Sequence, residues 1–131
     1  MKHEELTNKI IKAFYKAYNT LGYGFLEKVY QNALYLELIG EGFLVDKQYQ
    51  INVFYNGERV GEYYADLIVN GLVIIELKAH ECLIEEHENQ LINYLKATTI
   101  EVGLLLNFGK RPEIKRKIFD NEYKNILSNN Q

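Results

Sequence analysis

The chain has 131 residues and a formal net charge of −3, with 47% hydrophobic and 25% charged residues, values typical of a single globular domain over residues 1–131. Its one cysteine, Cys82, excludes an intrachain disulfide and an all-cysteine zinc or iron–sulfur centre. No apolar run is long enough to span a membrane, and the polar start MKHEELTNKI does not resemble a signal peptide, so we expect a cytoplasmic protein with no membrane contact.

Two helices are predicted at the start of the chain. Apolar residues recur at helical spacing over about residues 4–21, which predicts the first helix. Gly22-Tyr23-Gly24 interrupts this pattern. A second helix is predicted over about residues 25–41, with Gly42 as a plausible C-cap.

Three strands are predicted next. From Gln48 the chain is rich in β-branched and aromatic residues, which surround two Asn-Gly pairs. Asn56-Gly57 and Asn70-Gly71 each favour a tight turn, so we predict three antiparallel strands joined by two hairpins. The third strand is LVIIELK, residues 72–78, and its four leading apolar residues predict burial on both faces.

The second half of the chain completes an α/β pattern. A helix over about residues 84–97 and a strand over Val102–Phe108 are predicted, followed by an edge strand, Glu113–Phe119, and a short helix. The order is therefore α-α-β-β-β-α-β before this last segment, with a mixed β-sheet flanked by helices. Strands joined through a helix are parallel and the crossover is right-handed. In such sheets ligands bind beyond the carboxyl ends of the strands.

Two charged residues end the buried third strand. Glu76 and Lys78 share one face because side chains alternate along a strand, and buried charges are costly unless they meet a partner. A two-residue turn at Asn70-Gly71 would point Asp66 away from Glu76. An odd-length loop, such as Val69-Asn70-Gly71, would place Asp66 on the same face. The alternatives are a rim ion pair between Glu76 and Lys78 and a solvated Asp66.

If these charges converge, their chemistry suits a metal. Asp66 and Glu76 would offer the hard oxygen ligands that Mg²⁺ or Mn²⁺ needs. Lys78 would orient a water molecule or stabilise charge on a phosphate. We prefer positioning to general-base catalysis for Lys78, because a lysine between two carboxylates stays protonated.

Three motifs resemble a known family. Asp66, nine residues and then Glu76-Leu77-Lys78 resembles the D…(D/E)XK core of the PD-(D/E)XK nuclease superfamily. GFLEKVY, residues 24–30, is similar to the GxxExxY signature of the family named after it. QLINY, residues 90–94, looks like the QxxxY element of RecB-type exonucleases. The resemblance implies a restriction-endonuclease-like core, and NFG at 107–109 also fits it.

The resemblance implies roles for individual residues. Asp66, Glu76 and the backbone carbonyl of Leu77 would bind Mg²⁺ or Mn²⁺. Glu27 would reach the same metal from the second helix. Lys78 would be the third catalytic residue, beside the two carboxylates. The residues that would contact the substrate or brace the site are Tyr30, Gln90 and Tyr94.

Structural explanations compete for several of these residues. Glu27 follows Gly24 by three residues, as the N3 glutamate of a helix cap would. Beside Asp66 and Glu76 we favour the metal-ligand interpretation of Glu27. A packing tyrosine with a polar neighbour would also explain the spacing of Gln90 and Tyr94 on one helix face.

Nucleic-acid binding needs positive charge, and the most basic segment of this acidic chain is GKRPEIKRK, residues 109–117. Four residues in it are candidates for phosphate contacts, namely Lys110, Arg111, Lys115 and Arg116. Lysines that protect an edge strand from aggregation are an equally good explanation.

These features favour a Mg²⁺-dependent nuclease that hydrolyses phosphodiester bonds of nucleic acid, DNA rather than RNA. The alternative is a catalytically silent nuclease-like module that binds nucleic acid or a protein partner. Self-association into a homodimer, through the Tyr- and Phe-rich strands near residues 49–64, is a third hypothesis.

Overall fold

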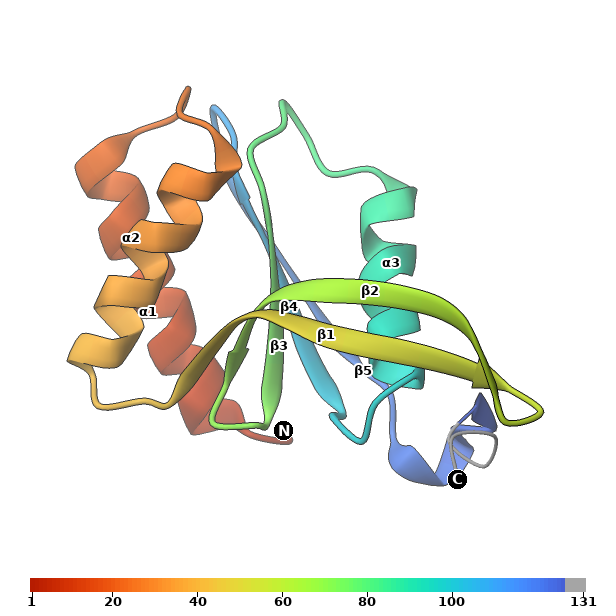
Figure 1. Ribbon diagram of the computed structural model, residues 1–131. Helices are drawn as coiled ribbons and strands as arrows, with labels where there is room; N and C mark the ends of the chain where they lie inside the picture. The colour runs from red at the N-terminus through yellow and green to blue at the C-terminus, as the bar shows by residue number, and fades with distance from the viewer. Residues whose placement is uncertain (127–131) are drawn as a thin grey trace.

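A mixed five-stranded sheet lies between helices on both of its faces in the computed structural model, which describes residues 1–126 (Figure 1). The strand order is β1-β2-β3-β4-β5, with β3 and β4 parallel and every other neighbouring pair antiparallel. The elements are α1 (Glu4–Leu21), α2 (Glu27–Gly40), β1 (Val45–Tyr55), β2 (Glu58–Val69), β3 (Val73–Lys78), α3 (Glu85–Lys96), β4 (Val102–Phe108), β5 (Pro112–Ile118) and the 3-10 helix η1 (Asn121–Tyr123).

The predicted element order and the parallel crossover are confirmed, and the boundaries differ by a few residues. The second helix begins at Glu27 rather than at residue 25, because the N–H of Phe25 donates to the Tyr30 hydroxyl outside the helix. It ends at Gly40, one residue before the predicted end, and its C-cap is Glu41 rather than Gly42. Gly42 follows the cap in the left-handed region at φ 89°. The short helix predicted near the end is η1, and the part of that prediction on residues 127–131 lies outside the described residues.

Strand β1 begins at Val45, earlier than the predicted Gln48. The reason is a pair of hydrogen bonds between Leu44 and the second hairpin. The N–H of Leu44 donates to the Asn70 Oδ1 at 2.9 Å, and the N–H of Asn70 donates to the Leu44 carbonyl at 2.7 Å. These bonds extend the β1–β2 pairing by one step beyond Val45 opposite Val69.

The second hairpin has a three-residue loop. Val69 pairs with Val73, so the loop is Asn70-Gly71-Leu72, one residue further along the chain than the odd-length loop considered from the sequence. Asn70 and Gly71 are both left-handed, with φ of 53° and 65°. Leu72 is 40% exposed, so the prediction that it belongs to the buried strand was wrong. The first hairpin has the expected two-residue loop, since Tyr55 pairs with Glu58.

The β1–β2 hairpin is much longer than β3 and leaves the sheet as an arm, residues 49–65, which crosses in front of α3 (Figure 1). Strand β2 pairs with β3 only over Leu67–Val69. Gln48, the residue immediately before the arm, has a positive φ of 51°. Ile51 of the arm is buried against α3 in one cluster with Leu91 and Leu95, which holds the arm to the helix.

The sheet therefore separates two apolar layers. Ile75 and Leu77 of β3 pack toward α1 and α2, whereas Ile74 faces α3. Because side chains alternate along a strand, Glu76 lies on the α3 face with Ile74. No helix in residues 1–126 is long and apolar enough to cross a membrane.

Candidate active site

The centre of the site is the point where β2 and β3 separate. Their backbone pairing ends at Leu67 opposite Ile75, so the next two residues to face each other are Asp66 and Glu76. The Asp66 side chain takes the place of the missing strand contact, since its Oδ2 accepts the N–H of Leu77 at 2.8 Å. The N–H of Asp66 in turn donates to Glu76 Oε2 at 3.3 Å. An odd-length loop thus places the two carboxylates on one face, as predicted, although the loop is Asn70-Gly71-Leu72 and its register puts Asp66 opposite Glu76 across the open ladder.

Burial makes this carboxylate pair unusual. Glu76 is only 3% exposed, and this desolvation raises its pKa well above the ordinary value. The Asp66 side chain raises the pKa of Glu76 further, through its interaction with the Glu76 carboxyl group and through its charge. The nearby charge of Lys78 and the hydrogen bond from the Asp66 N–H lower that pKa. Two apposed carboxylates repel each other, and a bound proton or cation relieves that repulsion.

The donor set fits a hard divalent cation. A strand residue directs its N–H and its carbonyl to the same side, so the carbonyl of Leu77 faces Asp66 as its N–H does. Two carboxylates and one backbone carbonyl suit Mg²⁺ or Mn²⁺, which fill their remaining positions with water and substrate phosphate. Within residues 1–126, no three or more His, Cys, Asp or Glu side chains are grouped to hold a metal, so the carbonyl and external ligands are needed.

Helix α3 brings two of the predicted residues to the pair. Tyr94 is 4% exposed, and its hydroxyl interacts with the carboxylate of Glu76. Burial first, and then the charges of Glu76 and Asp66, raise the pKa of Tyr94, so it stays a neutral hydrogen-bond donor. Gln90 Nε2 donates to the Tyr94 hydroxyl at 2.9 Å, which orients it.

Glu27 lies at the same edge of the sheet but contacts a different residue. Its carboxylate is 3.8 Å from His80 Nε2, and the His80 ring centroid is 4.7 Å from that of His87. Glu27 is the first residue of α2 and makes no capping hydrogen bond, so the alternative of an N3 cap glutamate was wrong. The structure brings Glu27 to the β3–α3 loop, and no hydrogen bond or ion pair among the described residues joins it to Asp66.

Lys78 lies between these two groups of residues. It ends β3 and is half-buried. Its charge lowers the pKa of Glu76 on one side and that of His87 on the other, although burial is the larger cause for His87. The charge of Lys78 therefore acts on both the carboxylate pair and His87.

His80 was missed from the sequence, and the end of β4 positions it. Asn107 is fully buried, and its Oδ1 accepts the N–H of His80 at 2.9 Å while its Nδ2 donates to the His80 carbonyl at 3.0 Å. A Cβ atom at Gly109 would lie 2.5 Å from that carbonyl, so only glycine fits there. The NFG motif at 107–109 was the one signal of this arrangement, and it does not indicate which residue is held.

Tyr30 lies in the core, away from the surface where a substrate would bind. Its side chain is fully buried, and its ring stacks on Phe108 with centroids 4.2 Å apart. Its hydroxyl donates to the Gly22 carbonyl at 2.6 Å and accepts the N–H of Phe25 at 3.1 Å. This placement favours a role in shaping the loop before Glu27 over a contact with substrate.

The basic segment is divided between two faces of β5. Arg116 donates to the backbone carbonyl of Lys2, on the side of α1. Lys117 points to α3, where its Nζ is 2.6 Å from Glu88, and Lys115 lies on that face too. Lys110 and Arg111 are exposed in the β4–β5 loop. The structure therefore does not gather the four predicted basic residues into one patch.

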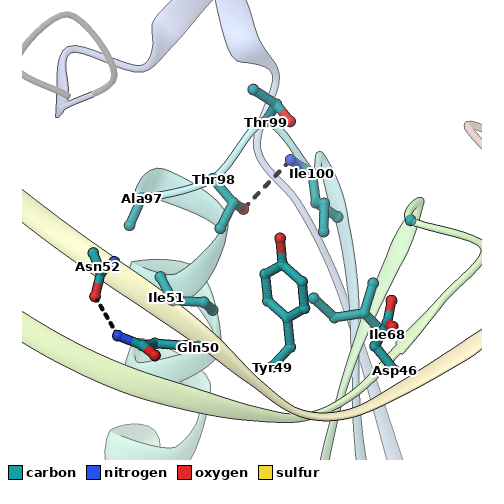
Figure 2. Close-up of a pocket in the computed structure, with 11 residues that line it drawn as sticks. Asp46, Tyr49, Gln50, Ile51, Asn52, Ile68, Ala97, Thr98, Thr99 and Ile100 are labelled. Atoms are coloured by element: carbon teal, nitrogen blue, oxygen red, sulfur yellow. Dashed lines mark hydrogen bonds between the residues drawn. The ribbon is translucent and has the colours of Figure 1, made fainter. Parts of the chain in front are cut away.

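A cavity of about 520 Å³ lies apart from these residues, at the other end of α3 (Figure 2). Its lining comes from β1, from the α3–β4 loop, and from Ile68 of β2 and Gly71 of the second hairpin. Tyr49 points from β1 toward Thr98 and Ile100. Thr98 Oγ1 accepts the N–H of Ile100 at 3.3 Å, which shapes that loop. Among residues 1–126, Asp46 is the one charged residue lining the cavity, and none of the predicted site residues contributes to it.

The fold and the apposed carboxylates at the open ladder define a nuclease-like α/β domain. A family model described as the PD-(D/E)XK nuclease superfamily matches residues 4–117, so the chain belongs to that superfamily. The matched range runs from α1 to β5 and includes every residue described above at the carboxylate pair. No curated protein and no solved structure matches the chain.

Proposed function

We propose that this protein is a divalent-metal-dependent nuclease that hydrolyses phosphodiester bonds of nucleic acid, DNA rather than RNA. The observation that carries the proposal is the pair of carboxylates, Asp66 and Glu76, facing each other where the β2–β3 ladder opens. Membership of the nuclease superfamily supports it. We also propose the GxxExxY group within that superfamily, because Glu27 of the motif lies at the same sheet edge and Tyr30 holds the loop before it.

Each residue has a distinct part in this proposal. Asp66, Glu76 and the Leu77 carbonyl would hold Mg²⁺ or Mn²⁺, which would supply polarisation of a water molecule and compensation of phosphate charge when bound. The ammonium group of Lys78 positions the attacking water and stabilises charge on the phosphate. Tyr94, oriented by Gln90, keeps the Glu76 carboxylate turned toward the metal. Glu27 contributes from the α2 side by positioning His80, which its carboxylate contacts.

The test is calorimetric titration with Mn²⁺ of the wild type and of the Glu76→Gln and Asp66→Asn variants. These substitutions keep the shape of the side chains and remove a ligand charge, so both should abolish binding. Asp46→Asn, an exposed aspartate on β1, is the matched control and should bind as the wild type does. Cleavage of single-stranded DNA, double-stranded DNA and RNA in Mn²⁺ should follow metal binding across the series.

The outcomes separate the proposal from its alternative. Binding and cleavage that vanish together in Glu76→Gln, and persist in Asp46→Asn, would support a metal nuclease. A wild type that binds no Mn²⁺ and cuts none of the substrates would contradict it. Such a result would favour the silent module that binds nucleic acid or a protein partner.

A further inference from the structure

A hollow of about 410 Å³ lies beside the carboxylate pair, between the arm and α3. One wall is Tyr63 of β2, and the other is the face of α3 that runs from Glu86 to Tyr94. Gln90 and Tyr94 therefore belong both to the candidate active site and to this hollow. Its volume falls within the usual range of small-ligand pockets, about 300–1,000 Å³.

The lining of the hollow combines one aromatic face with free amides. The Tyr63 ring is 45% exposed and lies 5.7 Å from the Tyr94 ring, tilted by 50°. Asn89 and Asn93 are exposed, and their side-chain amides form no hydrogen bond with another residue in the described part of the chain. An amide offers both a donor and an acceptor, and an aromatic ring offers a stacking surface.

The charge of the lining argues against a phosphate. Among residues 1–126, the lining of the hollow holds one acidic residue, Glu86, and no lysine or arginine. Its one histidine, His87, has a pKa that is lowered chiefly by burial, which favours the uncharged ring. A carboxylate repels phosphate, whereas it accepts hydrogen bonds from the N–H groups on the edge of a nucleobase, including N3–H of thymine. The hollow therefore suits a flat, polar, uncharged group with hydrogen-bonding edges.

We propose that this hollow binds an unpaired nucleobase of the strand that is cut at Asp66 and Glu76. This inference rests on the proposed function and names its substrate class, single-stranded or locally opened nucleic acid. In a duplex, neighbouring bases cover the faces of a base, and pairing occupies its Watson–Crick edge. An unpaired base can present its face to Tyr63 and its edge to Asn89 and Asn93.

The experiment measures the binding of a short fluorescein-labelled oligothymidylate, and of a labelled duplex, by fluorescence anisotropy in Ca²⁺. Tyr63→Ala should weaken single-strand affinity about 5- to 150-fold, the effect of losing one stacked base. Tyr63→Phe keeps the ring and should bind as the wild type does. Tyr55→Ala, an exposed tyrosine at the tip of the arm, is the matched control and should also leave affinity unchanged.

A second variant and a photochemical probe distinguish a loss of base contacts from misfolding of the Tyr63→Ala variant. Asn93→Ala alters an exposed helix residue, and it should weaken single-strand binding with an unchanged circular dichroism spectrum. An oligomer that carries 4-thiothymidine should crosslink to Tyr63 or to α3. Duplex affinity that exceeds single-strand affinity, an equal loss in Tyr55→Ala, or no loss in Tyr63→Ala would each overturn the inference.

These readouts are independent of the nuclease proposal. Anisotropy does not require cleavage, so single-strand binding that depends on Tyr63 can persist in a protein that binds no Mn²⁺. In that case the nuclease proposal fails and the base pocket stands. Conversely, the protein could bind Mn²⁺ and cut DNA while Tyr63→Ala leaves its single-strand affinity unchanged. That result would support the nuclease proposal and contradict the proposed base-binding hollow.

Discussion

The two hairpins of the sheet use the same dipeptide and end in different registers. Asn56-Gly57 and Asn70-Gly71 both place two consecutive residues in the left-handed region. The first forms a two-residue loop within a long ladder, whereas the second forms a three-residue loop in a ladder of three pairs. Asn-Gly therefore determines the turn, and contacts outside the turn determine the register.

The difference decides where the charges lie. A two-residue loop at Asn70-Gly71 would place Asp66 opposite Ile75, on the face away from Glu76. The additional loop residue, Leu72, places Asp66 opposite Glu76. A one-residue shift moves every side chain of a strand to the other face, so this single residue creates or removes the carboxylate pair.

Deleting Leu72 should have the largest effect. The second hairpin would then have a two-residue loop, as the first does. Either Asp66 would move to the other face of β2, away from Glu76, or Glu76 would turn into the apolar layer under α1 and α2. An unpaired charge buried there costs about 3–5 kcal/mol, so we expect a loss of about that size in the free energy of unfolding in urea, together with loss of Mn²⁺ binding. Inserting a glycine after Gly57 is the control in the first hairpin. It should cost under about 1 kcal/mol and leave Mn²⁺ binding intact.

The second prediction concerns pH and the buried carboxylate at the second hairpin. The folded-state pKa of Glu76 is raised, so the unfolded chain releases this proton at lower pH than the folded chain does. The metal-free protein should therefore lose stability as the pH rises from the unfolded pKa through the folded pKa. Glu76→Gln removes this loss, so its melting temperature should exceed that of the wild type at about pH 8 and converge with it at about pH 4.

Two controls sharpen the pH experiment. Glu58→Gln changes an exposed carboxylate at the first hairpin, and its melting temperature should follow that of the wild type across the same pH range. Saturating Mn²⁺ should stabilise the wild type and leave Glu76→Gln unchanged. A wild type whose stability does not depend on this carboxylate at any pH would show that Glu76 is not held in a buried pair.

The third prediction compares the two asparagines. Both lie in left-handed turns, so alanine should impose a similar backbone cost at each. Asn70 also accepts the N–H of Leu44 at 2.9 Å, whereas no side-chain hydrogen bond of Asn56 occurs within residues 1–126. Asn70→Ala should therefore cost about 1 kcal/mol more than Asn56→Ala in urea unfolding. Equal costs would mean that Leu44 does not hold the second turn.

The smallest expected difference is between the two turn glycines. Gly57 and Gly71 have φ of 81° and 65°, and a Cβ atom at either position would meet no atom within 4 Å. Only the backbone conformation penalises a side chain there, so Gly57→Ala and Gly71→Ala should each cost about 1–2 kcal/mol. Thermal unfolding that separates the two variants clearly would show that their turns differ in more than register.

Much of the fold was predictable because its signals are local. Helical spacing predicted α1 within a residue, and the apolar run Val102–Phe108 predicted β4. The turns followed from the dihedral preferences of Asn-Gly. Alternation along a strand placed Glu76 and Lys78 on one face. Each of these inferences uses residues within a few positions of one another.

Part of the candidate site was not predictable, because its contacts join distant segments. Asn107 binds His80 across 27 positions, and Leu44 binds Asn70 across 26. Nothing near Tyr30 indicates that its hydroxyl closes the loop at Gly22 rather than facing solvent. The division of Lys115 and Arg116 between two faces follows from strand alternation, yet it became visible only once β5 lay between α1 and α3.

Local residue patterns were sufficient to predict the element order, the positions of the turns and the charged residues at the end of β3. The tertiary structure decided the register of β2 against β3, the partner of Glu27 and the hollow between the arm and α3. An Asn-Gly turn is compatible with a two-residue loop or a three-residue loop, so the dipeptide alone does not specify the register of the strands. Hydrogen bonds between Leu44 and Asn70, and packing of the arm against α3, accompany the register in which Asp66 faces Glu76.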